Sequence, residues 1–245
     1  MQALKQETGN PRVDSSLADL SSLTQVRQLA AEIQSRCSHL DVLINNAGIF
    51  SKKRKLSEDG FELTFAVNYL APFLLTTLLR PLLVGSAPAR VVSLSSVAHR
   101  YTWLDKNHFQ GGSFYWGWVA YSRSKLLLIL FSNELASQLK GTGVTSNTLH
   151  PGIIPGTHVT KNIGIKIGTS RKTGAEAIVN LAVNPALEGI TGAYFSGHKK
   201  VNPSPFARDE AIQKRLWQES LIWTGLQPPE PMPSQETFPT DQGNL

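Results

Sequence analysis

Short apolar runs alternate with longer helical segments along this chain, and that alternation most restricts its fold. Leu40–Ile44, Arg90–Ser95 and Val144–Leu149 have the length of strands and are rich in apolar or β-branched residues. Between them, Phe61–Leu83 and Ala120–Leu139 are long enough for helices. Strands that alternate with helices of this length predict a doubly wound α/β fold, with a parallel sheet covered by helices on both faces.

The other expected elements are shorter. Apolar residues at helical spacing predict a helix from Leu23 to Ile33, with Ser21 or Ser22 as its N-cap. Within Phe61–Leu83, Pro72 is expected to cause a kink and Pro81 to mark the end of the helix. Further expected elements are a strand at Val13–Leu17, a helix at Gly174–Val183 capped by Ser170 or Thr173, a strand at Ala193–Phe195 and a helix at Asp209–Trp223.

A single domain is expected for residues 1–226. The 245 residues are 41% hydrophobic, which suffices for one large core, and no linker separates the periodic segments. Residues 227–245 form a proline-rich tail that is expected to be disordered.

The formal net charge is +6, and part of it comes from the run Lys52-Lys53-Arg54-Lys55. Such a run can indicate nucleic-acid binding or nuclear import. A solvated loop after a buried strand is the favoured interpretation, and no nucleic-acid partner is expected. The positive excess equally suits an anionic cofactor or a membrane surface. Cys37 is the single cysteine, which excludes an intrachain disulfide and suits a reducing compartment. No metal site is predicted.

Three polar or glycine-containing motifs follow the expected strands. They are Asn45-Asn46-Ala47-Gly48, Ser95-Ser96 and His150-Pro151-Gly152. In parallel sheets, ligands bind beyond the carboxyl ends of the strands. The sequence therefore predicts a binding site where these three motifs meet.

Tyr121 and Lys125 lie four residues apart on an expected helix and so share one face of it. A nearby ammonium favours the phenolate and lowers the phenol pKa, which would let Tyr121 exchange a proton with an alcohol or carbonyl oxygen. The hydroxyl of Ser96 could hold the same oxygen. Taken alone, the Tyr-x-x-x-Lys spacing also suits an exposed tyrosine beside a solvated lysine.

Together these motifs resemble the short-chain dehydrogenase/reductase family. The residues that carry the resemblance are Asn45 to Gly48, Asn68, Ser95-Ser96, Tyr121-Ser122-Arg123-Ser124-Lys125 and His150-Pro151-Gly152, in the order of the family. Within the family, the sequence is most similar to the retinol-dehydrogenase-like branch. The aromatic segment between Ser96 and Tyr121 also resembles this branch.

The resemblance implies a catalytic tetrad. Tyr121 would be the general acid/base, and Lys125 would lower its pKa and bind the nicotinamide ribose. Ser96 would orient the substrate oxygen, with Ser95 as the alternative. Asn68 would hold a water that links Lys125 to a proton relay, although a plain helical asparagine that satisfies a backbone group is another interpretation.

The resemblance also implies cofactor contacts. Asn46, Ala47 and Gly48 would line the cofactor, and Pro151, Gly152 and Ile154 would border the nicotinamide. Asp19-Leu20 resembles the family's acidic contact to the adenine ring, although Asp19 could equally be a turn residue. His150 is expected to be structural, because no nucleophile pairs with it.

The sequence departs from the family pattern at two places. The glycine-rich cofactor turn, Thr-Gly-x-x-x-Gly-x-Gly, is absent. We expect an N-terminally truncated Rossmann-like sheet in which the first two strands are missing and Val13–Leu17 is the third. The second departure follows Gly152, where Gly156 occupies the family's Thr or Ser position and Thr157 comes one residue later.

The resemblance implies an oxidoreductase that interconverts a lipophilic, retinol-like alcohol and its carbonyl with NADP or NAD, NADP being slightly favoured. The alternative is a catalytically impaired truncated isoform that acts at most as a binding partner. The two long helices could form a homodimer face. Membrane association is expected only through a missing N-terminal segment, so an intracellular location, cytoplasmic or membrane-associated, is left open.

Overall fold

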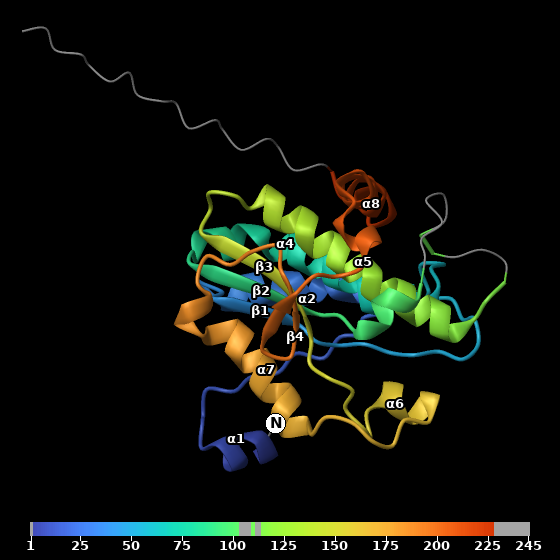
Figure 1. Ribbon diagram of the computed structural model, residues 1–245. Helices are drawn as coiled ribbons and strands as arrows, with labels where there is room; N and C mark the ends of the chain where they lie inside the picture. The colour runs from blue at the N-terminus through green and yellow to red at the C-terminus, as the bar shows by residue number, and fades with distance from the viewer. Residues whose placement is uncertain (1, 103–108, 111–113, 228–245) are drawn as a thin grey trace, which may run out of the picture.

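A mainly parallel five-stranded sheet forms the centre of the molecule (Figure 1). The computed structural model describes residues 2–102, 109–110 and 114–227. The strands lie in the order β1-β2-β3-β4-β5, with the first four parallel and β5 antiparallel to β4. Their bounds are β1 Val42–Asn45, β2 Ala89–Leu94, β3 Val144–His150, β4 Tyr194–Ser196 and β5 Lys199–Val201. The expected α/β fold is confirmed.

Helices cover both faces of this sheet (Figure 1). On one face, a large apolar cluster joins the sheet to α4, α5 and α8, and α2 packs on α4. On the other face, α7 packs Ala177 and Leu181 against Val92 and Leu149 of the sheet. The bounds are α2 Leu23–Arg36, α4 Ala71–Gly85, α5 Gly117–Gln138, α7 Arg171–Val183 and α8 Glu210–Trp223. Two short helices that the sequence patterns did not predict are α1 Gln2–Thr8 and α6 His158–Ile163.

The expected strand at Val13–Leu17 is wrong. This segment is an irregular, exposed loop, and the side chain of Leu17 points into solvent. Among the described strands β1 pairs only with β2, so β1 forms one edge of the sheet. The loop is held by polar contacts to α2 instead, where Asp14 forms an ion pair with Arg36 at 2.8 Å. A strand needs a neighbouring strand for its hydrogen bonds, and this segment has none beside it.

The helix after β1 ends later than Pro81 suggests. It starts with α3 (Leu63–Phe65), widens into a π-helical stretch, η1 (Ala66–Leu70), and continues as α4. Pro72 lies in the first turn of α4, next to that irregularity, as expected. Pro81 does not end the helix, which runs on to Gly85. Burial of Leu79 and Leu83 on either side outweighs the hydrogen bond that the proline cannot donate.

Leu63–Gly85 is also the one helix in the described residues that is long and apolar enough to cross a membrane. Most of its apolar stretch is buried in the molecule, where α4 packs between α2 and the sheet. The apolar composition of this helix is therefore explained by its burial in the core. The two long helices that could form a dimer face, α4 and α5, are partly covered within the chain by α2 and α8.

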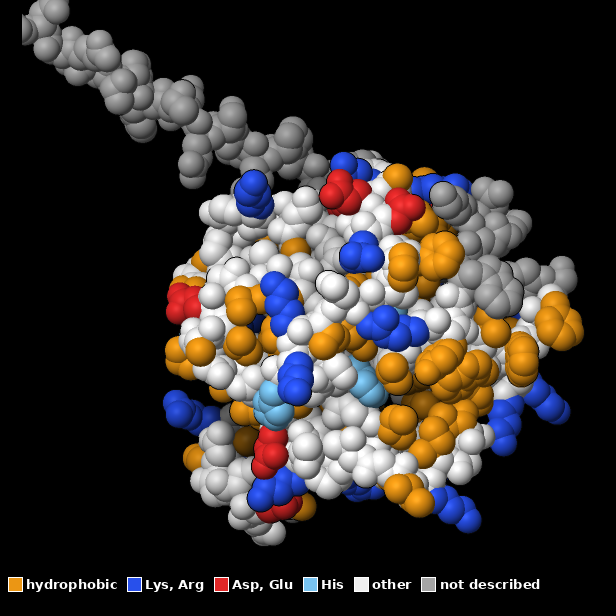
Figure 2. Space-filling view, viewed as in Figure 1, with side chains coloured by type: hydrophobic (Ala, Val, Ile, Leu, Met, Phe, Trp, Pro, Cys, Tyr) orange, Lys and Arg blue, Asp and Glu red, His pale blue; other side chains and the backbone are white. Residues whose placement is uncertain are grey.

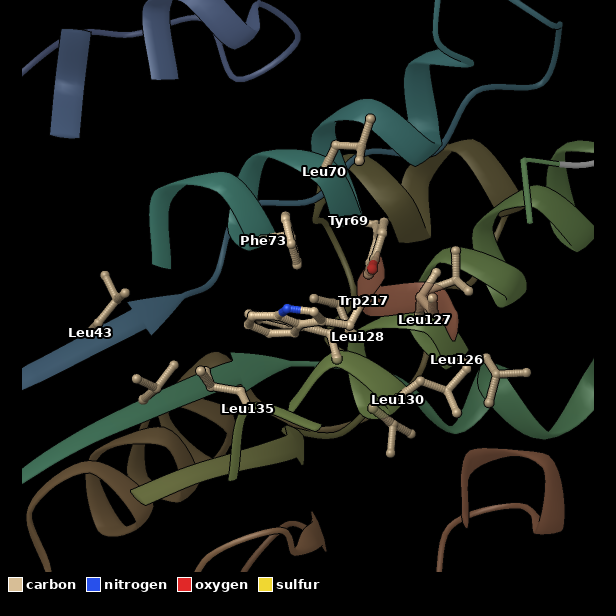
Figure 3. Packing of buried hydrophobic residues seen from close by; sticks show 14 of the residues in the cluster. Leu43, Tyr69, Leu70, Phe73, Leu126, Leu127, Leu128, Leu130, Leu135 and Trp217 are labelled. Atoms are coloured by element: carbon tan, nitrogen blue, oxygen red, sulfur yellow. The ribbon is translucent and has the colours of Figure 1, made fainter. Parts of the chain in front are cut away.

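Aromatic side chains join α8 to the core (Figure 3). Trp217 stacks on Phe131 of α5, with ring centroids 5.9 Å apart, and meets the edge of Phe73 of α4 at 5.0 Å. Its side chain is 2% exposed. Trp217 thus packs α8 against both α4 and α5.

Replacing Trp217 with alanine should lower the free energy of unfolding by about 3–5 kcal/mol, because it removes a fully packed indole. Ile222→Ala is the matched control on the same helix, since Ile222 is exposed and should change stability by less than about 0.5 kcal/mol. Urea denaturation measures both. Equal losses for the two variants would contradict the role given to Trp217.

Candidate active site

A cavity of about 560 Å³ opens at the carboxyl ends of β1, β2 and β3. The three motifs that follow these strands meet there, as the sequence predicts. The lining includes the proposed catalytic residues Tyr121, Lys125 and Ser96. It also includes six of the expected cofactor contacts, which are Asn46, Ala47, Gly48, Pro151, Gly152 and Ile154.

The loop after β1 comes very close to α5. Asn45, at the end of β1, donates hydrogen bonds to Thr76 at 3.0 Å and to Ser93 at 3.2 Å, which holds the strand end in place. A Cβ atom added at Gly48 would lie only 3.3 Å from Nζ of Lys125. Glycine therefore leaves the backbone of this loop open to a ligand that reaches the lysine.

Tyr121 lies on the first turns of α5 and is 8% exposed. Its ring meets the edge of Phe50 at 6.0 Å between centroids. Burial raises the pKa of its phenol, and a hydrogen bond with Ser96 acts in the opposite direction. Burial is the larger influence on the phenol in this structure. The lowering of the Tyr121 pKa by Lys125 stays a prediction.

Lys125 is 4% exposed, so the interpretation as a solvated lysine beside an exposed tyrosine is wrong. Its Nζ donates a hydrogen bond to the carbonyl oxygen of Leu94 at 2.8 Å and lies 5.7 Å from the centroid of the Tyr121 ring. Burial lowers the pKa of the lysine to about 8. An ammonium has three donors, and the others remain available for a ligand at this point of the cavity.

The two serines after β2 have different partners. Ser95 is buried and donates a hydrogen bond to the carbonyl oxygen of Lys125 at 2.7 Å, which joins β2 to α5. Ser96 accepts a hydrogen bond from the backbone of Ala98 at 3.2 Å and keeps its own proton for Tyr121 or a ligand. The geometry therefore favours Ser96 over Ser95 for contact with a substrate oxygen.

Asn68 lies in the π-helical stretch and is completely buried. Its Oδ1 accepts a hydrogen bond from the backbone N–H of Ile49 at 2.8 Å, and its Nδ2 donates to the Ile49 carbonyl at 3.0 Å and to Ser124 at 3.0 Å. A Cβ at Gly48 would lie 3.6 Å from Oδ1. Asn68 thus holds the loop after β1 against α5, beside Lys125.

The far side of the cavity is formed by the segment after β3. Gly152 has φ +102°, and a Cβ there would collide with the side chain of Thr169. Thr157 also lines the cavity, and its hydroxyl accepts a hydrogen bond from the backbone of Thr160 and caps α6. Ile154 packs closely over Gly174 at the start of α7.

Asp19 and Leu20 are not brought to this cavity. Asp19 accepts hydrogen bonds from the backbone and side chain of Ser21, both at 2.8 Å, and these lower the pKa of its carboxyl. Leu20 packs on the apolar cluster between α2 and α4. The two hydrogen bonds from Ser21 agree with the interpretation of Asp19 as a turn residue.

His99 is a positioning residue that the sequence motifs did not reveal. Its ring is buried, with Nδ1 donating to the carbonyl of Ser96 at 2.7 Å and Nε2 accepting from the backbone N–H of Ser204 at 3.1 Å. It also packs against Tyr194 at 4.8 Å between centroids. Burial lowers its pKa to about 4. The neutral imidazole therefore fixes the backbone of Ser96 to the strands beyond it. His150 also lines the cavity, and burial lowers the pKa of its imidazole.

Comparison with known proteins agrees with this geometry. The sequence model of the family described as short chain dehydrogenase matches residues 1–167. The chain belongs to the short-chain dehydrogenase family. It is 39% identical to retinol dehydrogenase 13 of Mus musculus over 238 residues, which cover 91% of this chain and 71% of the relative. Retinol dehydrogenase 14 of Homo sapiens is 42% identical over 221 residues, which cover 85% of this chain and 66% of the relative.

Solved structures show the same fold. An uncharacterised protein from Mycobacterium paratuberculosis is 29% identical, with a TM-score of 0.75 and coverage of 93% of this chain and 81% of that one. A short chain dehydrogenase from Burkholderia cenocepacia, solved in complex with NADP, is 25% identical, with a TM-score of 0.61 and coverage of 79% and 78%. This short-chain dehydrogenase is therefore a nicotinamide-dependent oxidoreductase, similar to retinol dehydrogenases.

The burial of neutral His99 predicts a pH dependence of stability. In the unfolded chain the imidazole takes up a proton near pH 6.5, whereas in the folded protein it does so only near pH 4. The free energy of unfolding should therefore fall as the pH drops from 6.5 toward 4. Chemical denaturation at a series of pH values measures this.

His99→Gln keeps a donor and an acceptor but does not titrate, so it should flatten that part of the profile. His158→Gln, at an exposed histidine of α6, is the matched control and should leave the profile unchanged. A His99→Gln profile as steep as that of the wild type would contradict the assignment.

Proposed function

We propose that this short-chain dehydrogenase interconverts a lipophilic alcohol and its carbonyl by hydride transfer, with Tyr121 as general acid/base. The observation that carries the proposal is that Tyr121, Ser96 and buried Lys125 line one cavity, with Nζ of Lys125 5.7 Å from the centroid of the Tyr121 ring. This arrangement supports a reaction in which a proton donor and a second hydroxyl contact one substrate oxygen.

The cavity residues fit the nicotinamide end of the cofactor. Gly48 leaves room above Lys125, whose free donors can hold ribose hydroxyls, and Gly152 and Ile154 border the opposite wall. When bound, the nicotinamide supplies or accepts the hydride. We propose NADP rather than NAD, because the Burkholderia cenocepacia relative is in complex with NADP.

The protonation states support the chemistry of the reduction. Burial keeps Tyr121 as a neutral phenol, which is the form that donates a proton to a carbonyl oxygen. The Ser96 hydroxyl can donate to the same oxygen as negative charge develops on it. Asn68 keeps the loop after β1 in contact with α5 beside Lys125. We propose that a water held near Asn68 links the lysine to solvent.

The substrate is proposed to be lipophilic because one end of the cavity is apolar. This end lies between the 3₁₀ turn after β2, the start of α5 and α6. The apolar lining residues there are Ala98, Tyr101, Trp118, Ile153, Val159 and Ile163. Apolar walls around a few polar groups are usual for sites that bind apolar small molecules. The relatives' printed names, retinol dehydrogenases, agree with this class of substrate.

Tyr121→Phe should lower kcat by about 10²- to 10⁴-fold, because it removes the proton that is transferred and little else. Cofactor affinity should change little. The matched control is Tyr69→Phe, which removes a buried hydroxyl that pairs with Ser220 in the core. Steady-state turnover of retinal and a short aliphatic aldehyde measures the effect. Turnover by Tyr121→Phe at the wild-type rate would remove Tyr121 from this role.

A second candidate is a chain that binds a partner or ligand without turnover. The motif Thr-Gly-x-x-x-Gly-x-Gly occurs nowhere in the 245 residues, so they provide no such turn for the pyrophosphate. Affinity for the phosphate part of the cofactor would then have to come from other groups.

Isothermal calorimetry with NADPH and NADH on this chain distinguishes the two candidates. The proposal expects binding that is stronger for NADPH and weaker in Lys125→Met, which loses the ribose donors. Lys214→Met, at an exposed lysine of α8, is the control. If neither cofactor binds at millimolar concentration, the catalytic proposal fails for this chain and the second candidate stands.

A further inference from the structure

Large apolar side chains are exposed around the opening of the cavity. Tyr101 and Ile153 line it and are 64% and 39% exposed. Trp116, which precedes the first turn of α5, is 67% exposed, and Phe114 lies two residues before it. Figure 2 shows hydrophobic side chains gathered on the face over α6 and the start of α5, with basic side chains nearby. Exposed apolar patches with a polar rim mark interaction sites.

The run Lys52–Lys55 lies directly beside these aromatic residues. A Cβ at Gly117 would touch the backbone of Ser51 and come within 3.2 Å of Cα of Lys52. The hydroxyl of Tyr115 also donates to the carbonyl of Ser51 at 2.9 Å. All four basic side chains are exposed, and none takes part in the ion pairs found among the described residues.

The opposite side of the opening also combines apolar side chains with exposed basic ones. Val159 and Ile163 of α6 pack on the cluster around Tyr121, while Lys161 between them is exposed. Ile167 is largely exposed and follows the exposed Lys166. The segments that border the opening contain no aspartate or glutamate, and these are residues 49–57, 97–102, 114–123 and 151–172.

We infer that this rim, defined by Lys52–Lys55, Trp116, Tyr101, Ile153 and Lys161–Ile167, docks on a membrane surface that contains anionic lipids. Basic side chains are drawn to anionic headgroups, and tryptophan and tyrosine favour the interfacial region of a bilayer. Tyr101 and Ile153 of this rim line the cavity, so docking would open it toward the acyl chains. A lipophilic substrate could then enter without crossing water, and this part of the inference rests on the proposed function.

A nucleic acid is the other polyanion that such a basic run could bind. The exposed Ile153 and Ile167 at the opening favour the bilayer, because a phosphate backbone offers aliphatic side chains no apolar surface. Lipid tails would instead take these side chains out of water.

The test is flotation of the full chain with vesicles of phosphatidylcholine alone or with about 30% phosphatidylserine. We expect binding to the phosphatidylserine vesicles. It should weaken at least about tenfold when all four residues of Lys52–Lys55 are changed to glutamine, because each basic residue near such a surface is attracted to the anionic headgroups. Trp116→Ala should weaken binding to the same vesicles by several-fold, because it removes one aromatic side chain that favours the membrane interface.

The matched control replaces Lys140, Arg208 and Lys214, which lie at the opposite end of the sheet, with glutamine. This variant should bind as the wild type does. Circular dichroism checks that all variants are folded. Absence of binding to phosphatidylserine vesicles, or equal binding by the rim and control variants, would overturn the inference.

Tighter binding of a duplex DNA oligonucleotide than of the vesicles would also overturn it, in favour of a nucleic-acid partner. Turnover of a short, water-soluble aldehyde separates the inference from the proposed function. The Lys52–Lys55 variant should keep this turnover and lose only the stimulation of retinal turnover by vesicles. A chain that binds vesicles through the rim but turns over no aldehyde would reject the proposed function and leave the docking surface standing.

Discussion

Burial of α5 between the sheet and α8 is the constraint on which the rest of the structure depends. Nearly every residue from Ala120 to Ala136 is inaccessible to solvent, including several polar ones. Most buried polar groups in proteins are hydrogen-bonded, and several of those on α5 bond to other elements. Lys125 bonds to the end of β2, Ser124 to Asn68 in the π-helical stretch, and Ser132 to β3. The site is assembled by these obligatory bonds.

The same burial determines the charges at the site. It raises the pKa of the Tyr121 phenol and lowers that of Lys125, so both groups are shifted toward their neutral forms. The hydrogen bond from Ser96 partly offsets the shift of the tyrosine. His99, which holds the backbone of Ser96, is neutral for the same reason. Desolvation is therefore the dominant electrostatic influence on the proton-handling groups.

Most of the fold and much of the site could be predicted from residue patterns. The strands at β1, β2 and β3 and the helices α2, α5, α7 and α8 follow from local periodicity and caps such as Ser22 and Ser170. The strand expected at Val13–Leu17 was wrong, because a strand needs an adjacent strand for its backbone hydrogen bonds and the local sequence does not specify whether one is present. The helix end expected at Pro81 was wrong, because the free energy lost with the missing hydrogen bond of the proline is smaller than the free energy gained by burying the leucines around it.

At the site, the motifs after β1, β2 and β3 predicted where the residues meet, because the carboxyl ends of parallel strands share one edge of a sheet. The local spacing of Tyr121 and Lys125 also placed them on one helix face. Tertiary structure alone decided that the lysine binds the Leu94 carbonyl, that His99 supports Ser96, and that Lys52–Lys55 lies beside Trp116. These are contacts between segments far apart in the chain. Their energies depend on burial and on neighbours, which exist only once the helices have packed on the sheet.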